Sequence, residues 1–312
     1  MSSEPKQQDF HNRMEVAVRT IVSPIEFGRS QNEDNYLVID AAGRARYLLD
    51  QRDVWTQVDD WPAGHIRLAI LDGMGGHSNG REAAENTVTG MLAIPAAREL
   101  KTFTSDLDAL HLRLHQQMHI GGAEPGCTLT VLDIPPSGPA LLFHVSDSRL
   151  YMIAENEAVC LTVDHVPATK FAMRGIIDEA EWRLQVHEKS GYQIAQAFVL
   201  GNTLSDSALY ANDLDERLYE LHDGNLPPFL RGRGDRRLLQ LQQGKIYLLA
   251  SDGLWHLPRP HGFIRRWPQI LGRGDKPLEA VLDDLFLELV MVSNEDPGLR
   301  GDNSTAIAFR LF

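Results

Sequence analysis

The sequence predicts an α+β fold in which blocks of antiparallel strands are kept apart from the helices. Three observations indicate it. Short β-branched apolar runs are bounded by Gly, Pro, Asp and Asn, several links between them are too short for parallel crossovers, and amphipathic helical segments lie outside the strand blocks. The chain has 312 residues, 43% of them hydrophobic and 23% charged. Such a chain is long enough to bury a sizeable core.

Nine segments are predicted as strands from their length, β-branched content and boundaries. They are residues 16–22, 35–40, 65–71, 127–134, 140–146, 149–154, 158–163, 245–251 and 304–311. Four of them follow one another from Cys127 to Val163 through the links IPPSGP, SDS and ENE. Parallel neighbours need a long crossover, so we expect these four strands to form an antiparallel meander.

Three helices are predicted from apolar positions spaced at helical intervals. The first, residues 80–94, follows a glycine-rich loop. The second lies within residues 105–119, with Ser105 as its expected cap. The third begins at Pro277, a favoured residue for a first turn, and ends before Pro297.

No linker, internal repeat or low-complexity tract divides the chain, so we expect residues 1–312 to form a single domain. Residues 1–14 are expected to be a flexible tail. Two segments, residues 41–65 and 202–236, are interpreted as insertions, and residues 164–195 as an irregular polar stretch. Loops of such length often carry function.

The charge balance narrows the class of partner. A formal net charge of −13 disfavours nucleic acids and anionic membranes, since both require a basic surface. No apolar stretch approaches the length of a membrane span, and the polar N-terminus lacks the apolar region of a secretory signal. The two cysteines cannot build a disulfide framework. We therefore expect a cytoplasmic protein.

The most informative pattern is the position of acidic residues beside the predicted strands. One such acid alone is more often a turn former or edge protection. Buried together, several carboxylates are costly unless cations neutralise them, and an all-oxygen cluster suits Mg²⁺ or Mn²⁺. Gly73, which lacks a Cβ, allows a sharp turn and offers its carbonyl as a further ligand. The acids are Glu33, Asp34, Asp72, Asp147, Asp252 and Asp302.

Six fragments, in this order, resemble the metal-dependent PP2C-type (PPM) serine/threonine protein phosphatases, specifically their bacterial branch. The fragments are GRSQNEDNYLV, AILDGMGGHSNGREAAE, HVSDSRLYMI, LTVDH, LLASDGLW and GDNSTAIAF. The resemblance runs from about Arg19 to Phe309. It implies a four-layer α-β-β-α sandwich of two antiparallel sheets flanked by helices, with two Mn²⁺ or Mg²⁺ ions at one end.

The resemblance also implies a role for each matching residue. Asp72 would bridge the two ions, and Asp252 and Asp302 would complete the first. The Gly73 carbonyl would bind the second, and Glu33 would complete its shell directly or through water. Asp34 would orient bound water, and Arg29 would grip the substrate phosphate. Asp147, together with Asp252, would hold the weaker third ion of bacterial members.

Three residues depart from the pattern of the family. Met74 stands where eukaryotic members have a histidine proposed as general acid, and His77 nearby is not shown by the sequence to replace it. Ser146 stands where many members have glycine. His256 follows SDGLW at a position where an acid is frequent, which bears on the third ion.

The resulting hypothesis is a phosphatase acting on phosphoserine and phosphothreonine in a protein partner, opposing a serine/threonine kinase. A hydroxide bound to the two ions would attack phosphorus directly. The alternative is a catalytically silent module that binds a phosphoprotein. A two-metal nuclease would use similar chemistry but is disfavoured by the acidic charge.

Two further patterns contain clustered histidines or arginines. His111, His115 and His119 recur at four-residue intervals and are interpreted as a helix face rather than a metal site. The basic cluster of residues 231–237 is interpreted as a solvated loop, with phosphopeptide docking as the alternative.

Overall fold

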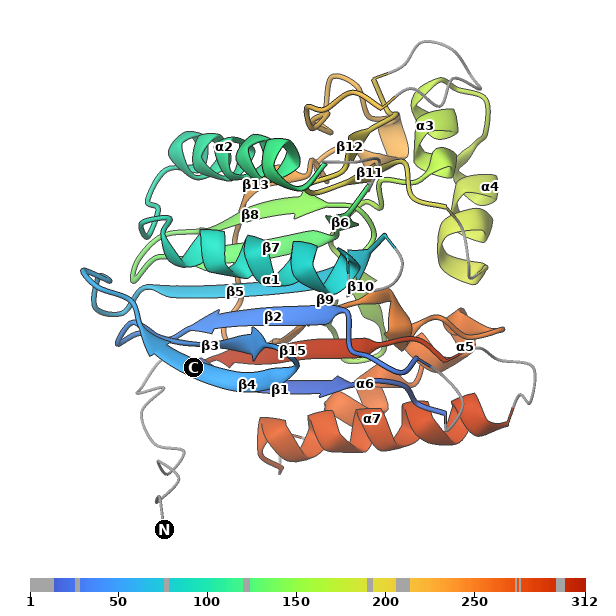
Figure 1. Ribbon diagram of the computed structural model, residues 1–312. Helices are drawn as coiled ribbons and strands as arrows, with labels where there is room; N and C mark the ends of the chain where they lie inside the picture. The colour runs from blue at the N-terminus through green and yellow to red at the C-terminus, as the bar shows by residue number, and fades with distance from the viewer. Residues whose placement is uncertain are drawn as a thin grey trace.

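Two antiparallel sheets lie face to face in the computed structural model, and helices cover both outer faces (Figure 1). The structure describes residues 14–25, 29–75, 79–119, 124–189, 193–205, 214–272, 274, 276–295 and 301–312. The expected four-layer sandwich is confirmed.

The larger sheet has eight strands, in the order β13-β8-β7-β5-β2-β3-β4, with β6 paired to the end of β5. Its strands are β2 (Asp34–Ile39), β3 (Arg44–Leu49), β4 (Arg52–Gln57), β5 (Ile66–Met74), β6 (Gly126–Cys127), β7 (Leu129–Ile134), β8 (Ala140–Val145) and β13 (Arg236–Leu239). Each neighbouring pair is antiparallel.

The smaller sheet has five strands in the order β1-β15-β14-β9-β10. Its strands are β1 (Met14–Ile21), β9 (Arg149–Ile153), β10 (Ala158–Cys160), β14 (Ile246–Ala250) and β15 (Ser304–Leu311). A separate two-stranded ribbon joins β11 (Gln196–Ala197) to β12 (Gly201–Asn202).

Side chains that alternate along each central strand fill two different apolar layers, one beneath the helices and one between the sheets. In β2, Leu37 and Ile39 pack toward the helices on the larger sheet, whereas Tyr36 and Val38 face the smaller sheet. Successive side chains of a strand point to opposite faces of the sheet. A strand that is buried on both faces therefore has a continuous run of apolar residues in its sequence. The other central strands follow the same rule: in β15, Ile307 enters the layer between the sheets.

Helices close the two outer layers. On the larger sheet lie α1 (Asn79–Leu92) and α2 (Leu100–Met118); on the smaller sheet lie α5 (Pro260–Ile264), α6 (Trp267–Leu271) and α7 (Leu278–Asn294) (Figure 1). The apolar stripe predicted for α7 is buried against the smaller sheet.

A smaller apolar cluster lies beside one end of the sandwich. It includes α3 (Pro167–Met173), α4 (Glu179–Arg183) and the π-helical turn Leu184–Glu188, and it packs around Trp182. The segment expected to be irregular, residues 164–195, is therefore partly helical where the structure describes it. Short 3-10 turns cover Pro228–Leu230 and Asp252–Leu254.

Three local expectations are corrected, and the insertion at residues 41–65 stays a prediction. The four-strand meander breaks at SDS, because β7 pairs with β8 in one sheet and β9 with β10 in the other. The second helix begins at Leu100 with Glu99 as its N-cap, so Ser105 lies inside it. Residues 41–65 include the β3–β4 hairpin, which extends the larger sheet. Of the expected tail, Met14 is buried in β1, and residues 1–13 lie outside the described residues.

Candidate metal centre

Carboxylates from both sheets meet at one end of the sandwich. Asp34 and Asp72 are directly opposite each other on β2 and β5 of the larger sheet. Asp252 follows β14, and Asp302 precedes β15, on the smaller sheet. The Ser251 hydroxyl donates to Asp34 Oδ2 over 2.6 Å, which joins the two sheets at this point.

Uncharged side chains hold the backbone around these acids. Thr128 Oγ1 accepts a hydrogen bond from the Asp72 N–H over 2.8 Å. The Asn303 side chain accepts from the Glu33 N–H and donates to the carbonyls of Val22 and Gln31. Asp34, Asp72 and Glu33 are therefore each held by a neighbour that itself carries no charge.

The acids are close enough to alter one another's ionisation. Burial, and then the charges of Asp252 and Asp302, raise the pKa of Asp34 to about 7 against the opposing hydrogen bonds from Ser251 and Thr305. Burial and the charge of Asp34 raise the pKa of Asp72 well above its usual range, and Asp252 and Asp302 add to this. Asp252 has a lowered pKa, since contacts with His256 and Asp72 outweigh its burial.

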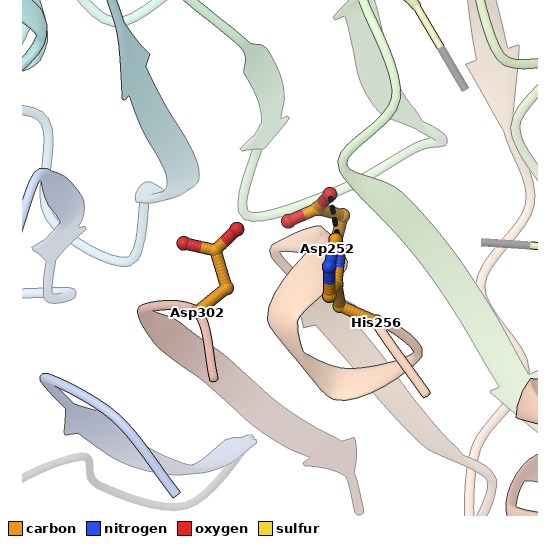
Figure 2. A group of neighbouring side chains, drawn as sticks. All are labelled: Asp252, His256 and Asp302. Carbon is orange, nitrogen blue, oxygen red and sulfur yellow. Dashed lines mark ion pairs between the residues drawn. The ribbon is translucent and has the colours of Figure 1, made fainter. Parts of the chain in front are cut away.

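Among the described residues, a group of three possible metal ligands consists of Asp252, His256 and Asp302. One side-chain atom from each lies within 4.8 Å of the others (Figure 2). His256 follows the 3-10 turn that begins at Asp252, and its Nδ1 lies 3.9 Å from Asp252 Oδ2.

Arg29 reaches this group from the segment before β2. Its Nε donates to Asp302 Oδ1 over 2.8 Å, and its Nη1 lies 3.6 Å from Glu33 Oε2. The Arg29 side chain is 51% exposed, whereas that of Glu33 is 11% exposed. The guanidinium thus forms the solvent-facing rim of the acidic group.

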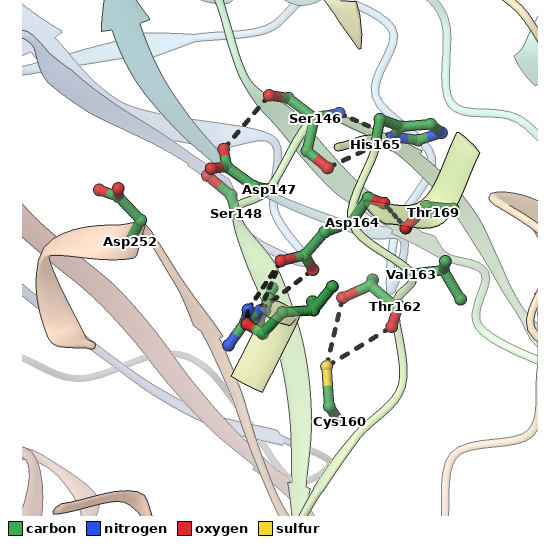
Figure 3. Close-up of polar contacts among 12 residues, drawn as sticks. Ser146, Asp147, Ser148, Cys160, Thr162, Val163, Asp164, His165, Thr169 and Asp252 are labelled. Carbon is green, nitrogen blue, oxygen red and sulfur yellow. Dashed lines mark hydrogen bonds and ion pairs between the residues drawn. The ribbon is translucent and has the colours of Figure 1, made fainter. Parts of the chain in front are cut away.

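Asp147 lies on the SDS link that carries the chain from β8 to β9. Burial, and next the charge of Asp252, raise the pKa of Asp147 well above its usual range. Ser146 precedes it with a φ of +81° and donates from its hydroxyl to Asp147 Oδ1 over 3.2 Å. The link lies beside residues 162–165, with Asp252 across from Asp147 (Figure 3).

Gly73 is required by a close approach rather than by a turn. It lies within β5 and its φ is not positive, which corrects the expected sharp turn. A Cβ built at Gly73 would lie 2.2 Å from the Gly80 carbonyl oxygen in the first turn of α1 and 2.7 Å from the Glu33 carbonyl oxygen. Backbone therefore surrounds this position on two sides.

The donor set fits divalent cations. Asp34 Oδ1 and Asp252 Oδ1 are buried atoms without a hydrogen-bond partner in the part of the chain that the structure describes. Buried carboxylate oxygens are normally hydrogen-bonded or bound to a cation. A carboxylate-rich group is typical of Mg²⁺ and Mn²⁺ sites.

Sequence reasoning assigned no role to Ser251, Asn303 or Thr128. Ser251 and Asn303 stand inside the quoted fragments SDGLW and GDNST, directly beside an acid. Thr128 lies between β6 and β7, and only the folding of this segment beside β5 reveals its contact with the Asp72 N–H.

The other candidates serve the fold. His111 is buried, and both ring nitrogens contact backbone, at Val199 N and Glu216 O. Arg236 pairs with Asp108 Oδ2 over 2.9 Å with its side chain 7% exposed, so the basic cluster is not wholly a solvated loop. His77 lies outside the described residues.

Comparison with known proteins bears on the fold. No protein-family model matches the sequence. Protein phosphatase PhpP of Streptococcus pneumoniae is 32% identical over 132 residues, which are 38% of this chain and 52% of PhpP, so the match spans about half the length of this relative.

Solved structures match over nearly the whole chain. The serine/threonine phosphatase of S. agalactiae matches with a TM-score of 0.63 and 20% identity, covering 96% of this chain and 100% of that one. The catalytic domain of serine/threonine phosphatase PstP, crystallised with two manganese ions, matches with a TM-score of 0.57 and 20% identity over 96% and 98%. The chain has the fold of bacterial PPM/PP2C-type serine/threonine phosphatases.

Spanning a lipid bilayer requires a long and apolar helix. Among the helices that the structure describes, none combines the length and the apolar character needed to span a bilayer.

Proposed function

We propose that this chain is a metal-dependent protein phosphatase that hydrolyses phosphoserine and phosphothreonine. The observation that supports it most is the meeting of carboxylates from both sheets at one end of a fold shared with serine/threonine phosphatases. The buried oxygens Asp34 Oδ1 and Asp252 Oδ1, which have no partner among the described residues, are what a cation site requires.

Two Mn²⁺ or Mg²⁺ ions would be shared among the residues nearest this end. Asp72 would contact both ions, Asp252 and Asp302 the first, and Glu33 and the Gly73 carbonyl the second. Asp147 would join Asp252 in holding a third, weaker ion. When bound, such ions supply an activated water and neutralise charge on the phosphoryl group.

The remaining residues would orient the substrate and water. The planar guanidinium of Arg29 contacts the carboxylates of Asp302 and Glu33, and it can exchange them for two phosphate oxygens in a bidentate contact. Asp34 has Oδ2 fixed by Ser251, which leaves Oδ1 to accept a hydrogen bond from water.

The proposed substrate is a phosphoprotein made by an opposing serine/threonine kinase in the cytoplasm. A formal charge of −13 does not favour a nucleic-acid substrate. We propose that residues 1–312 act as one phosphatase domain.

The test is hydrolysis of an aryl phosphate and of a phosphopeptide panel by metal-free protein, before and after addition of Mn²⁺ or Mg²⁺. Activity is expected only with the ion and is lost again with chelator. Asp252→Asn is expected to lower kcat by about 100-fold or more, since it removes a charge from the site. Hydrolysis that survives chelation would contradict the mechanism.

Asp59→Asn is the matched control, because Asp59 is an exposed acid in the loop before β5, at the opposite end of that strand from Asp72. Its activity is expected to equal that of the wild type. Tight Mn²⁺ binding without turnover of any phosphosubstrate would instead favour the silent phosphoprotein-binding module, and cleavage of DNA or RNA would favour a nuclease.

A further inference from the structure

His256 occupies a position typical of a metal ligand. Its N–H donates to the Asp252 carbonyl over 2.8 Å, which fixes the backbone of His256 one turn beyond Asp252. Its ring therefore lies beside the Asp252 carboxylate, and Asp302 approaches from the start of β15 (Figure 2).

The spacing distinguishes this histidine from others that pair with an aspartate. His65 lies 2.7 Å from Asp133, and His165 lies 2.9 Å from Asp235, so both make direct hydrogen bonds and both are buried. His256 Nδ1 is 3.9 Å from Asp252 Oδ2, which is beyond hydrogen-bond length.

The wider gap matches the spacing of two ligands around one cation. Nitrogen and oxygen ligands lie about 2.0–2.2 Å from an ion such as Mg²⁺ or Zn²⁺, so two ligands of one ion are separated by about 3–4 Å. The ring nitrogen and the carboxylate oxygens of Asp252 and Asp302 all lie within 4.8 Å of one another. In addition, Asp252 Oδ1 has no hydrogen-bond partner among the described residues.

We propose that His256 is a nitrogen ligand of an ion held with Asp252 and Asp302, and that this ligand makes the centre prefer Mn²⁺ and later transition-metal ions over Mg²⁺. Imidazole nitrogen suits transition-metal ions, whereas Mg²⁺ prefers oxygen. The inference rests on the proposed function only because both use the carboxylates of Asp252 and Asp302. It concerns which ion binds there, not which reaction follows.

Metal binding is measured without turnover. Metal-free wild type and His256→Ala are titrated calorimetrically with Mn²⁺, Ni²⁺ and Mg²⁺. Because loss of even an outer partner of a ligand costs about 10–100-fold in affinity, the variant is expected to lose about 10-fold or more for Mn²⁺ and Ni²⁺. Its affinity for Mg²⁺ is expected to change much less.

Pulsed electron paramagnetic resonance of the Mn²⁺-loaded protein gives a second, direct readout. Nitrogen modulation is expected in the wild type and not in His256→Ala. His222→Ala, which removes an exposed histidine from another loop, is the matched control and should retain the modulation. His256→Asp, which replaces nitrogen with oxygen, is expected to lose the modulation and to gain affinity for Mg²⁺ relative to Mn²⁺.

The outcomes separate the two proposals. An unchanged Mn²⁺-to-Mg²⁺ affinity ratio and an unchanged spectrum in His256→Ala would overturn the ligand assignment while leaving phosphatase activity untouched. Nitrogen modulation that disappears in His256→Ala, in a wild type that hydrolyses no phosphosubstrate, would support the ligand assignment and refute the proposed function.

Discussion

At the scale of the residue, Gly73 shows how closely the backbone must pack beside the acids. Gly73→Ala would place a Cβ 2.2 Å from the Gly80 carbonyl oxygen, and because that atom belongs to the backbone it cannot rotate away. We expect α1 to shift and the free energy of unfolding to fall by about 1–3 kcal/mol. Urea denaturation measures the loss, and calorimetry with Mn²⁺ measures the accompanying fall in metal affinity.

Gly262→Ala provides the matched control for this substitution. Gly262 lies in α5, its φ is not positive, and a Cβ there would meet nothing within 4 Å. Alanine favours helix over glycine by about 1 kcal/mol, so this variant should equal or exceed the wild type in stability. Equal stability of Gly73→Ala and wild type would contradict the close packing described for β5 and α1.

At the scale of the element, the link between β8 and β9 carries Asp147 from one sheet to the other. Ser146 has a φ of +81°, a conformation that costs a residue with a Cβ about 1–2 kcal/mol. Its N–H donates to His165 Nδ1 over 2.9 Å, and Asp235 Oδ2 lies 2.9 Å from the other nitrogen of that ring. Neighbouring buried groups thus hold the strained conformation.

Two substitutions at Ser146 separate this strain from the hydroxyl. Both Ser146→Ala and Ser146→Gly lose the hydrogen bond to Asp147, but only alanine keeps a Cβ at positive φ. We expect the glycine variant to be more stable than the alanine variant by about 1 kcal/mol, although glycine's freedom in the unfolded chain acts in the other direction. Thermal denaturation of the two variants measures this difference. An alanine variant at least as stable as the glycine variant would show that the backbone at Ser146 is not strained.

The same link shows where sequence reasoning about elements fails. Alternation and turn residues located most strands, because these signals are local. The three-residue link SDS was too short for a parallel crossover, yet the chain uses it to change sheets instead of forming a hairpin. Likewise, nothing local marked Glu99 rather than Ser105 as the cap of α2, because packing against the sheet stabilises its first turn.

At the scale of the whole molecule, the candidate metal centre exists only when the two sheets are docked. Asp34 and Asp72 belong to one sheet, and Asp252 and Asp302 flank strands of the other. Their positions beside the strands predicted from the sequence that these acids act together, and their roles as metal ligands stay a prediction. The proximity of His256 to Asp302 and the contact from Ser251 to Asp34 depend on docking, so no local pattern could have revealed them.

Bringing these acids together makes the stability of the metal-free protein depend on pH. The pKa of Asp34 is raised to about 7, and those of Asp72 and Asp147 are raised well above their usual range. Between the unfolded pKa of about 4 and the folded value, the native state binds more protons than the unfolded chain, so stability falls as pH rises. Asp252, whose pKa is lowered, acts in a lower window, because its stabilising contribution is constant above about pH 4 and is lost as the pH falls further.

A bound divalent ion displaces those protons and neutralises the charges of the carboxylates in their place. Without metal, the carboxylates of the centre are therefore expected to lower the Tm progressively between about pH 5 and pH 8. Buried histidines whose pKa is lowered, among them His111, His144 and His187, act in the opposite direction below about pH 6.5, and they do so equally with and without the ion. Saturating Mn²⁺ should raise the Tm at both pH values and by more at pH 8, where fewer protons compete for the ligands. Thermal denaturation in chelator and in Mn²⁺ across this range is the measurement. A gain in Tm that is the same at pH 5 and pH 8 would mean that the ion does not bind at these carboxylates.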